Sequence, residues 1–317
     1  MDVLIQGAGA VGLGLASALA AAGARVRLVA RPATAEALRT HGCLRTGLFG
    51  RVEVPPERLR VAGDPAALGP GPVAAVLVAT KSFDTEAAAR ALAAAPGVLG
   101  PEAPIVLCQN GWGNAERFAA RFDRERVFNA RVITGFLRRS LHHVEITVHA
   151  EPVRVGSLFG ADASRLAPLC EAIARGGIPC ETTDHIAEEL WAKMLYNGCL
   201  NPLGAIFGVP YGALGASAAG RALLTDVTRE IFAVMAAAGF RTRWAHPEAF
   251  LADLFGELLP ATASHESSTL QDLRAGRRTE IDALTGEVVR LGERHGVPTP
   301  VNRTLLGMVR FREARGA

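Results

Sequence analysis

The chain has 317 residues, 49% of them hydrophobic, and a formal net charge of +3 at pH 7. This length supports a large core and favours two domains over one. The small, dispersed positive charge lacks the basic surface that binds nucleic acids or membranes, so neither partner is expected. Five scattered cysteines without a C-x-x-C pair favour reduced thiols in a cytoplasmic protein. The histidines show no metal-ligand spacing, and the adjacent His142 and His143 are typical of a polar turn, so no metal site is expected.

The apolar segment at residues 3–23 is similar in composition to a signal peptide or a membrane span. The chain starts Met1-Asp2, however, without the basic residues that precede a signal sequence. The glycines between residues 7 and 14 suit a turn followed by close helix packing better than a helix that faces lipid. We therefore interpret this segment as soluble structure.

The N-terminal half of the chain alternates between apolar strand patterns and helical patterns. A strand is expected at the start of the chain, followed by a helix up to about residue 23, and further strands at 24–31, 72–81 and 103–111 with a helix at 85–95. Continuous apolar runs are typical of parallel strands covered on both faces. Residues 142–158 are expected to form a hairpin or edge strands. The pattern predicts an α/β fold with a Rossmann-like, doubly wound parallel sheet.

The pattern changes after residue 179. From residue 185 almost to the end it is helical, interrupted by turns that contain Gly and Pro, and no strand pattern occurs. We predict a short linker near residues 178–184 followed by an all-helical domain. The expected domains are residues 1–181 and 182–317.

The first turn carries the motif Gly7-x-Gly9-x-x-Gly12. In a dinucleotide fingerprint the first glycine makes the tight turn, the second lets the backbone approach the pyrophosphate, and the third packs helix against strand. Here the motif follows a strand and opens a helix, which makes it more specific than the spacing alone. The alternative is a glycine-rich turn that binds nothing. The expected dinucleotide-binding residues are Gly7, Ala8, Gly9, Ala10, Val11 and Gly12.

The end of the second predicted strand favours NADP over NAD. An NAD site usually has Asp or Glu there to bind the ribose 2′-hydroxyl, whereas this chain reads Val29-Ala30-Arg31-Pro32. Arg31 would attract a 2′-phosphate, although an ordinary surface arginine is the alternative. Lys81 adds a second cation at the C-terminal end of the third strand, where ligands bind in such sheets. We predict NADP(H) as the cofactor and Arg31 and Lys81 among its ligands.

Lysine is rare in this chain, because only Lys81 and Lys193 of the 34 basic residues are lysine. Lysine can lose its proton when it is desolvated, whereas arginine keeps its proton. We therefore expect the two lysines to serve chemistry, with chance retention as the alternative. Asn110 follows the next strand at the same edge of the sheet. We expect its side chain to hydrogen-bond the ribose or the substrate; the alternative is an ordinary amide in a turn.

Lys193, Asn197 and Asn201 recur at every fourth residue of the stretch KMLYNGCLNP. On a helix these side chains share one face. A solvated face in this chain would carry Arg and Glu, and Asn is a poor helix former, so the stripe is expected to line a polar cleft. Hydride addition to a ketone needs a proton donor, which a partly desolvated Lys193 can provide. Pro202 after this stripe predicts a helix end or a kink.

A second polar cluster reads SSTLQD from Ser267 and TEID from Thr279, and its hydroxyls suit either a plain helix cap or a carboxylate site. Taken in order, GAGAVG, VARP, ATKSFDT, QNG, KMLYNGCLNPLGAI and SSTLQDLRAGRRTEID resemble the ketopantoate reductase (2-dehydropantoate 2-reductase) family over essentially the whole chain. The resemblance implies a Rossmann domain followed by a helical domain, with the active site in the cleft between them. It also implies NADP phosphate ligands, a proton donor, substrate amides, a hydroxyl for the substrate carboxylate and a carboxylate near the cofactor. These roles fall respectively on Arg31 and Lys81; Lys193; Asn197 and Asn201; Ser268; and Glu280. The resemblance also places Asn110 at the junction of cofactor and substrate, where it would bind both.

Two departures from the family pattern concern the substrate. Tyr211, which we also expect to bind substrate, replaces an expected Asn, and residues 132–136 (VITGF) replace a Thr-Thr-His-type run. Tyr211 and Phe136 add apolar bulk near the expected pocket. The first prediction is an oxidoreductase, monomeric or homodimeric, that reduces ketopantoate to pantoate with NADPH in pantothenate and coenzyme A biosynthesis. The alternatives are reduction of a bulkier 2-oxo acid or ketone, and a non-catalytic dinucleotide sensor. A sensor need not keep Lys193, Asn197, Ser268 and Glu280 together.

Overall fold

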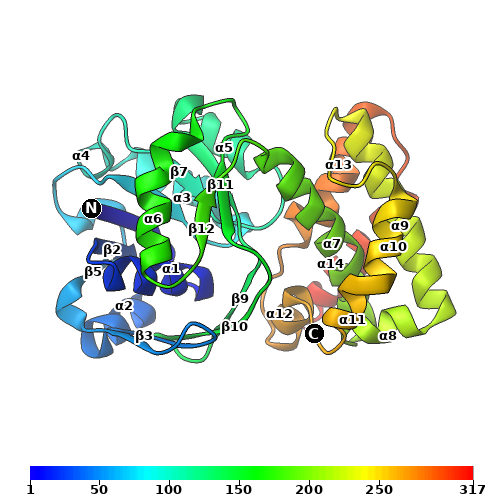
Figure 1. The fold of residues 1–317 in the computed structure, drawn as a ribbon, viewed down its shortest axis with the longest axis horizontal. Coiled ribbons are helices and arrows are strands. Elements are labelled where there is room, and N and C mark those ends of the chain that lie inside the picture. Colours follow the sequence, from blue (N-terminus) through cyan, green and yellow to red (C-terminus); the bar gives the residue numbers. More distant parts are fainter. Residues whose placement is uncertain (317) are drawn as a thin grey trace. The chain divides into compact units, whose positions relative to one another are not determined.

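The computed structural model describes residues 1–316, which form two compact units (Figure 1). Unit 1 consists of Met1–Gln109 and Asn114–Ile186. Unit 2 consists of the chain from Ala187 onward together with the short segment Asn110–Gly113. The sequence predicted a single boundary between residues 181 and 182 and did not predict that this segment belongs with the helical unit.

Unit 1 is built on an eight-stranded sheet in which all neighbouring strands run parallel except β8 and β11. This arrangement confirms the predicted α/β fold. In spatial order the strands are β12 (Cys180–Thr182), β11 (Val153–Gly156), β8 (Val127–Arg131), β7 (Ile105–Leu107), β6 (Ala75–Val78), β1 (Asp2–Gln6), β2 (Arg25–Val29) and β5 (Leu59–Ala62).

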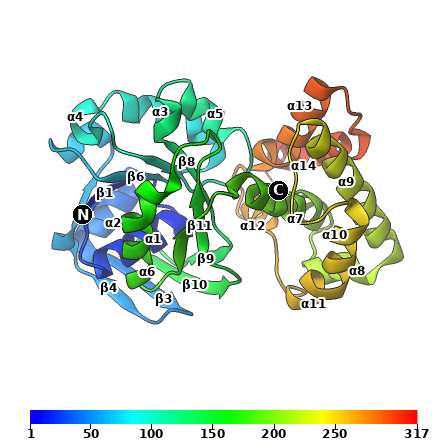
Figure 2. The same ribbon diagram turned by 45° about the horizontal axis from the view of Figure 1, so that its top comes forward.

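Helices cover both faces of this sheet, as the continuous apolar strands require. Val3 and Ile5 of β1 are buried in one core cluster, whereas Leu4 between them is buried in another, because successive strand residues point to opposite faces. On the first face lie α1 (Ala10–Ala21), α2 (Pro32–His41) and α6 (Ala167–Arg175); on the second lie α3 (Thr85–Ala93), α4 (Pro96–Leu99) and α5 (Asn114–Ala119) (Figure 2). Short 3-10 turns occur at Pro56–Arg58, Pro65–Leu68, Ser82–Asp84, Arg124–Arg126 and Ala163–Leu166.

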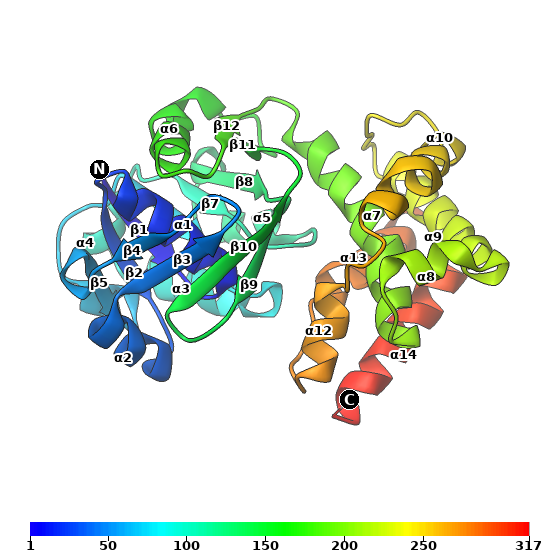
Figure 3. The ribbon, with the colours of Figure 1, turned by 60° about the horizontal axis from the view of Figure 1, so that its bottom comes forward.

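A second, four-stranded sheet packs on the outer side of α1 (Figure 3). Its strands in spatial order are β4 (Val52–Val54), β3 (Cys43–Gly47), β10 (His143–His149) and β9 (Thr134–Arg138). The predicted hairpin or edge strands at 142–158 are wrong, because β10 lies between β3 and β9 in this sheet, and β11 lies between β12 and β8 in the larger one. The chain leaves the second sheet between β10 and β11. Pro152 lacks the amide hydrogen that a continued strand ladder needs. The buried Arg131 of β8 also pairs with Glu151 over 2.8 Å, which fixes this segment beside the larger sheet.

Unit 2 is helical throughout its described part, in agreement with the prediction. Its helices are α7 (from Ile186 to Phe207), α8 (Tyr211–Ala216), α9 (Ala218–Ala237), α10 (Pro247–Asp253), α11 (Leu259–Ala261), α12 (Ser268–Arg274), α13 (Thr285–His295) and α14 (Pro300–Ala314), with a π-helical stretch at Leu254–Leu258 and a 3-10 turn at Ile281–Ala283. Within residues 1–316, no helix has both the length and the apolar character needed to cross a bilayer.

Helix α7 continues through Pro202, so the predicted helix end at this position is wrong. A proline inside a helix removes one backbone hydrogen bond, but Cys199, Leu200 and Leu203 around it are at most 1% exposed, and their burial favours the helical path. The helix ends at Phe207, where Arg312 of α14 donates to the last-turn carbonyl groups of residues 205 and 206.

Candidate functional site

The glycine turn between β1 and α1 is shaped by close backbone packing. Gly7 has a φ of +108°, which favours glycine, and a Cβ atom there would lie 2.8 Å from the amide nitrogen of Thr80. A Cβ atom on Gly12 would lie only 2.0 Å from the carbonyl oxygen of Gly7. These two glycines are therefore required by the fold itself.

Gly9 is different, because a Cβ atom at this position would not clash with any protein atom. It is the N-cap residue of α1, it has extended backbone angles, and the nearest atom to a Cβ placed there is the carbonyl oxygen of Ala79 at 3.8 Å. No side chain caps the helix at this end. An open space before uncapped helix N–H groups suits a phosphate group, so the turn from Gly7 to Gly12 fits a dinucleotide. Of the other predicted turn residues, Ala8 is buried, and Ala10 and Val11 pack against the core.

Arg31 lies between β2 and α2 with its side chain 84% exposed, and its guanidinium lies 3.7 Å from the carboxylate of Asp84. The sequence did not predict a second guanidinium nearby. Arg138 of β9 donates to the hydroxyl of Thr34 in the first turn of α2 over 2.7 Å. The pKa of Arg138 is lowered, first by burial and then by the charge of Arg31. Two cations therefore lie near the start of α2.

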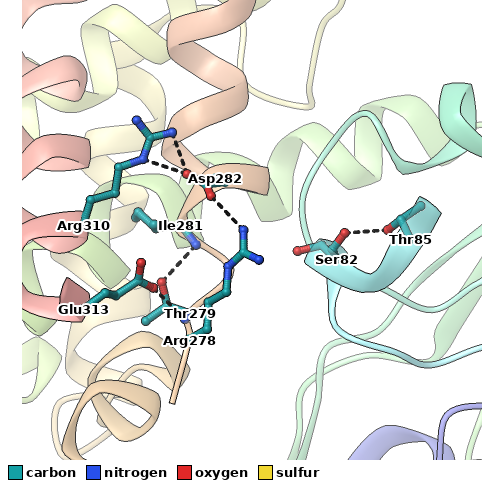
Figure 4. A network of polar contacts seen from close by, with 8 residues as sticks. All are labelled: Ser82, Thr85, Arg278, Thr279, Ile281, Asp282, Arg310 and Glu313. Atoms are coloured by element: carbon teal, nitrogen blue, oxygen red, sulfur yellow. Dashed lines mark hydrogen bonds and ion pairs between the residues drawn. The ribbon is translucent and has the colours of Figure 1, made fainter. Parts of the chain in front are cut away.

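The loops after β6 and β7 are joined by side-chain hydrogen bonds within unit 1. The amide nitrogen of Gln109 lies 3.1 Å from the hydroxyl of Thr80 and 3.2 Å from the carbonyl oxygen of Lys81. It also donates to the hydroxyl of Thr85, which in turn bonds the carbonyl oxygen of Ser82 over 2.6 Å (Figure 4). These contacts hold the backbone of Lys81 at the carboxyl edge of the sheet.

Unit 2 brings together three of the predicted site residues. The ammonium of Lys193 donates to Oδ1 of Asn110 over 2.6 Å, and Nδ2 of Asn110 lies 3.3 Å from Oε2 of Glu280. Glu280 is 7% exposed, whereas Lys193 and Asn110 are half-buried. A cation, a carboxamide and a carboxylate therefore form a continuous chain in which the carboxamide accepts from one charge and donates to the other.

The segment Asn110–Gly113 is anchored in unit 2 by backbone and aromatic contacts. The amide of Trp112 donates to the carbonyl oxygen of Ala283 over 2.9 Å, and its ring centroid lies 5.0 Å from that of Trp191 and 4.8 Å from that of Phe240. Gly111 has a φ of +86°, and a Cβ atom there would lie 2.3 Å from the same carbonyl oxygen. This anchoring fixes the position of Asn110 relative to Lys193.

The backbone on both sides of Glu280 is held by a polar network (Figure 4). The amide of Thr279 donates to the carboxylate of Glu313 over 2.6 Å, and the hydroxyl of Thr279 accepts from the amide of Ile281 at 3.2 Å. Arg310 pairs with Asp282 over 2.7 Å. Because these bonds flank Glu280, its carboxylate is presented from a rigid segment.

The predicted stripe of Lys193, Asn197 and Asn201 lies along α7. Exposure falls along the stripe, from the half-buried Lys193 and Asn197 to Asn201, which is 3% exposed. The carbonyl oxygen of the Asn201 side chain accepts a 2.6 Å hydrogen bond from the hydroxyl of Tyr211. Tyr211 is 2% exposed, so its bulk is part of the packing of unit 2.

Ser267 and Ser268 have different environments at the start of α12. Ser267 is buried and caps the helix, since its hydroxyl accepts from the amide of Leu270 at 3.0 Å. Ser268, the residue predicted to hold a carboxylate, is exposed in the first turn, and its hydroxyl makes no hydrogen bond to any of residues 1–316. The capping role and the proposed binding role therefore fall on separate residues.

Phe136 does not support the expectation of extra bulk in a substrate pocket. A Cβ atom on Gly14 of α1 would lie 2.2 Å from the Phe136 ring, and the ring packs against the core of unit 1. Its size therefore fills the space beside α1.

Comparison with known proteins relates the whole chain to one family. The family model described as "Ketopantoate reductase PanE/ApbA" matches residues 3–158, and the one described as "Ketopantoate reductase PanE/ApbA C terminal" matches residues 185–313. A 2-dehydropantoate 2-reductase of Aquifex aeolicus is 32% identical over 99% of this chain and 97% of its own length. One of Halobacterium salinarum is 30% identical over the full length of both. The crystal structure of a PanE/ApbA family ketopantoate reductase from Ralstonia eutropha JMP134 aligns with a TM-score of 0.86 and 33% identity, covering 100% of this chain and 99% of the other.

Proposed function

The chain belongs to the ketopantoate reductase family, and we propose that it reduces 2-dehydropantoate to pantoate with NADPH. The family consists of oxidoreductases that act on a CH–OH group, and membership implies a nicotinamide dinucleotide cofactor. The observation that carries the proposal is the hydrogen bond from Lys193 to Asn110. It fixes the orientation of the ammonium group in the polar cluster of unit 2. A proton donor with a defined direction is what ketone reduction requires.

In this mechanism the nicotinamide, when bound, supplies the hydride. Lys193 gives its proton to the oxygen on which negative charge develops, and its positive charge stabilises that oxygen before the transfer. Asn110 orients the ammonium through its carbonyl oxygen. Glu280 fixes the other end of the same carboxamide, so the amide cannot rotate without losing a bond to a carboxylate.

The preference for NADPH is supported by the end of β2. Arg31 is exposed there, and the chain has neither Asp nor Glu at the end of β2, where an NAD site usually has one for the ribose 2′-hydroxyl. Arg138 adds positive charge close to the same helix start. A 2′-phosphate would be attracted by this charge, whereas the hydroxyl of NAD would gain little.

The remaining site assignments are part of the same proposal. Asn197 and Asn201 bind the polar groups of the substrate, and Ser268 binds its carboxylate from the first turn of α12. Residues 1–181 bind the nucleotide, with Lys81 at its phosphates, and residues 182–317 form the helical domain with the proton donor. The active protein is a monomer or a homodimer.

The two alternative functions have less support. A bulkier substrate was suggested by Tyr211 and Phe136, but both rings are used in packing. A dinucleotide sensor has no use for the chain of contacts from Lys193 through Asn110 to Glu280. Ketopantoate is therefore the first substrate to assay.

The experiment measures NADPH oxidation by the purified protein with ketopantoate, pyruvate and benzoylformate, and repeats the assay with NADH. We expect the highest kcat/KM with ketopantoate and NADPH. A higher kcat/KM with benzoylformate would replace the proposed substrate by a bulkier one. Tight NADPH binding without turnover of any oxo acid would instead support the sensor.

A further inference from the structure

We propose that Tyr211 is a positioning residue that acts through Asn201, whose carboxamide it turns so that the amide nitrogen faces an acceptor oxygen of the substrate. The inference rests on the proposed function, because it concerns how that substrate is recognised. It goes beyond that function by assigning Tyr211 an indirect role and by specifying the kind of group that Asn201 selects.

The first observation is the hydrogen bond itself. The hydroxyl of Tyr211 donates to Oδ1 of Asn201 over 2.6 Å, and both residues are almost completely buried, at 2% and 3% exposure. A carboxamide has one acceptor side and one donor side. Holding Oδ1 at the phenol therefore fixes the direction in which Nδ2 points.

The second observation is that Nδ2 of Asn201 is left without a protein partner. It makes no hydrogen bond to any of residues 1–316, and it is not among the fully buried atoms that lack a partner, so it retains contact with solvent. When a bound substrate displaces this solvent, a donor left unpaired in an otherwise buried side chain is costly. An external acceptor oxygen would satisfy it.

The third observation is that the phenol is itself held firmly. The amide of Tyr211 donates to the carbonyl oxygen of His265 over 3.0 Å, and the Tyr211 ring packs edge-on against Tyr196 with centroids 5.7 Å apart. The pKa of Tyr211 is raised well above its ordinary value, mainly by burial. The hydroxyl therefore stays protonated and remains a donor at neutral pH.

These contacts define the class of substrate that benefits. Asn201 presents a neutral donor, so it recognises an oxygen that can accept a hydrogen bond without requiring a charge. The hydroxyl group of ketopantoate is such an oxygen. A 2-oxo acid of the same carbon skeleton without the hydroxyl would leave Nδ2 unpaired, and it would gain nothing from Tyr211. Tyr211 therefore contributes to selectivity for hydroxylated 2-oxo acids.

The test compares Tyr211→Phe with the unmodified protein on two substrates, ketopantoate and its analogue without the hydroxyl, 3,3-dimethyl-2-oxobutanoate. We expect kcat/KM for ketopantoate to fall roughly three- to tenfold, mostly through KM, as for the loss of one neutral hydrogen bond. The ratio of kcat/KM between the two substrates should fall by the same factor. The KM for NADPH should not change.

The chain offers a matched control, since Tyr196 is its other tyrosine. Its hydroxyl pairs with that of Thr262 over 2.8 Å and its ring packs on Tyr211, but it does not bond Asn201. Tyr196→Phe should leave the substrate ratio unchanged. If Tyr211→Phe lowers kcat/KM equally for both substrates, Tyr211 has only a structural role and the inference is wrong.

A second measurement does not depend on turnover. Protein labelled with ¹³C at the tyrosine Cζ carbon contains two labelled residues, which Tyr196→Phe assigns. We expect Asn201→Ala to shift the Tyr211 signal, and pantoate to shift it in the unmodified protein. If neither change moves the signal, the inference fails whatever the activity. A third outcome is that ketopantoate is not turned over and that the Tyr211 signal responds to Asn201→Ala but not to pantoate. This outcome would overturn both the proposed function and the recognition role. It would support only the hydrogen bond from Tyr211 to Asn201.

Discussion

The ammonium of Lys193 and the side-chain oxygen of Asn110 are 2.6 Å apart, although 83 positions separate the two residues in the chain. Asn110 follows a strand of unit 1 in sequence but belongs to unit 2 by its contacts. This acceptor gives one N–H of the ammonium a fixed direction, and this constrains where the other two can point.

Replacing Lys193 by Ala should lower kcat roughly 10²- to 10⁴-fold, the usual contribution of a positioned proton donor. NADPH affinity, measured by fluorescence titration, should change little because Gly7 to Gly12 are untouched. Lys193→Arg is the control, since it keeps the charge but holds its proton too tightly to donate it. Substantial activity in Lys193→Arg would show that charge alone is needed and would contradict the role of proton donor.

Replacing Arg31 by Ala should raise the KM for NADPH roughly 10- to 100-fold, as expected for loss of a hydrogen bond between charged groups. The KM for NADH should stay within about twofold, since NADH has no 2′-phosphate. Arg25→Ala is the matched control, because Arg25 begins β2, the strand that precedes Arg31, is 85% exposed and also faces an aspartate, Asp2, at 3.8 Å. Equal effects on both cofactors would mean that Arg31 supports the fold rather than the phosphate.

Gly9 and Gly12 should respond differently to alanine. Gly12→Ala brings Cβ to 2.0 Å from the carbonyl oxygen of Gly7, so the free energy of unfolding should fall by about 1–3 kcal/mol. Gly9→Ala meets no protein atom closer than 3.8 Å, so its free energy of unfolding should change by less than about 0.5 kcal/mol. Only the dinucleotide would be hindered, and its dissociation constant should rise. Urea unfolding and NADPH titration of both variants decide this, and unchanged affinity in Gly9→Ala would place the pyrophosphate elsewhere.

The thiols of Cys43 and Cys199 should resist modification in the folded protein. Burial is the main cause that raises the pKa of each from 9.0 to about 12. Each thiol therefore favours the folded state fully below pH 9, and this contribution is lost as the pH rises from 9 to about 12, because the unfolded chain ionises first. Labelling with a disulfide reagent at about pH 8 should modify neither residue until urea is added. Rapid labelling of either cysteine in the native protein would contradict their burial.

Local patterns predicted β1, β2, β6 and β7 because these strands are short apolar runs flanked by glycine or proline, but they did not predict β5, β8 and β12. They failed where tertiary pairing decides the partner. The segments around Cys43 and Val144 contribute to the second sheet, and β10 pairs in parallel with β3 about a hundred positions earlier, a contact that no local signal specifies. At Pro202 a local signal predicted a helix end that does not occur. Burial of the neighbouring residues outweighs the propensity of proline to end a helix.

The candidate site was predicted residue by residue but not in its connections. The spacing of Lys193, Asn197 and Asn201 was enough to place them on one helix, and the resemblance supplied Glu280. No sequence pattern indicates that Asn110 bonds both Lys193 and Glu280. These two hydrogen bonds depend on how Trp112 packs in the helical unit. The hydrogen bond from Tyr211 to Asn201 also could not be predicted from the sequence, because it depends on how α8 is placed against α7.

The anchored segment Asn110–Gly113 also limits how this protein can be dissected. A gene fragment that begins at residue 182 would encode Lys193 without its acceptor and Trp191 without the ring of Trp112. No single cut of the chain yields a helical fragment with a complete polar cluster. Chimaeras that graft these helices onto another nucleotide-binding unit must transplant the four-residue segment as well.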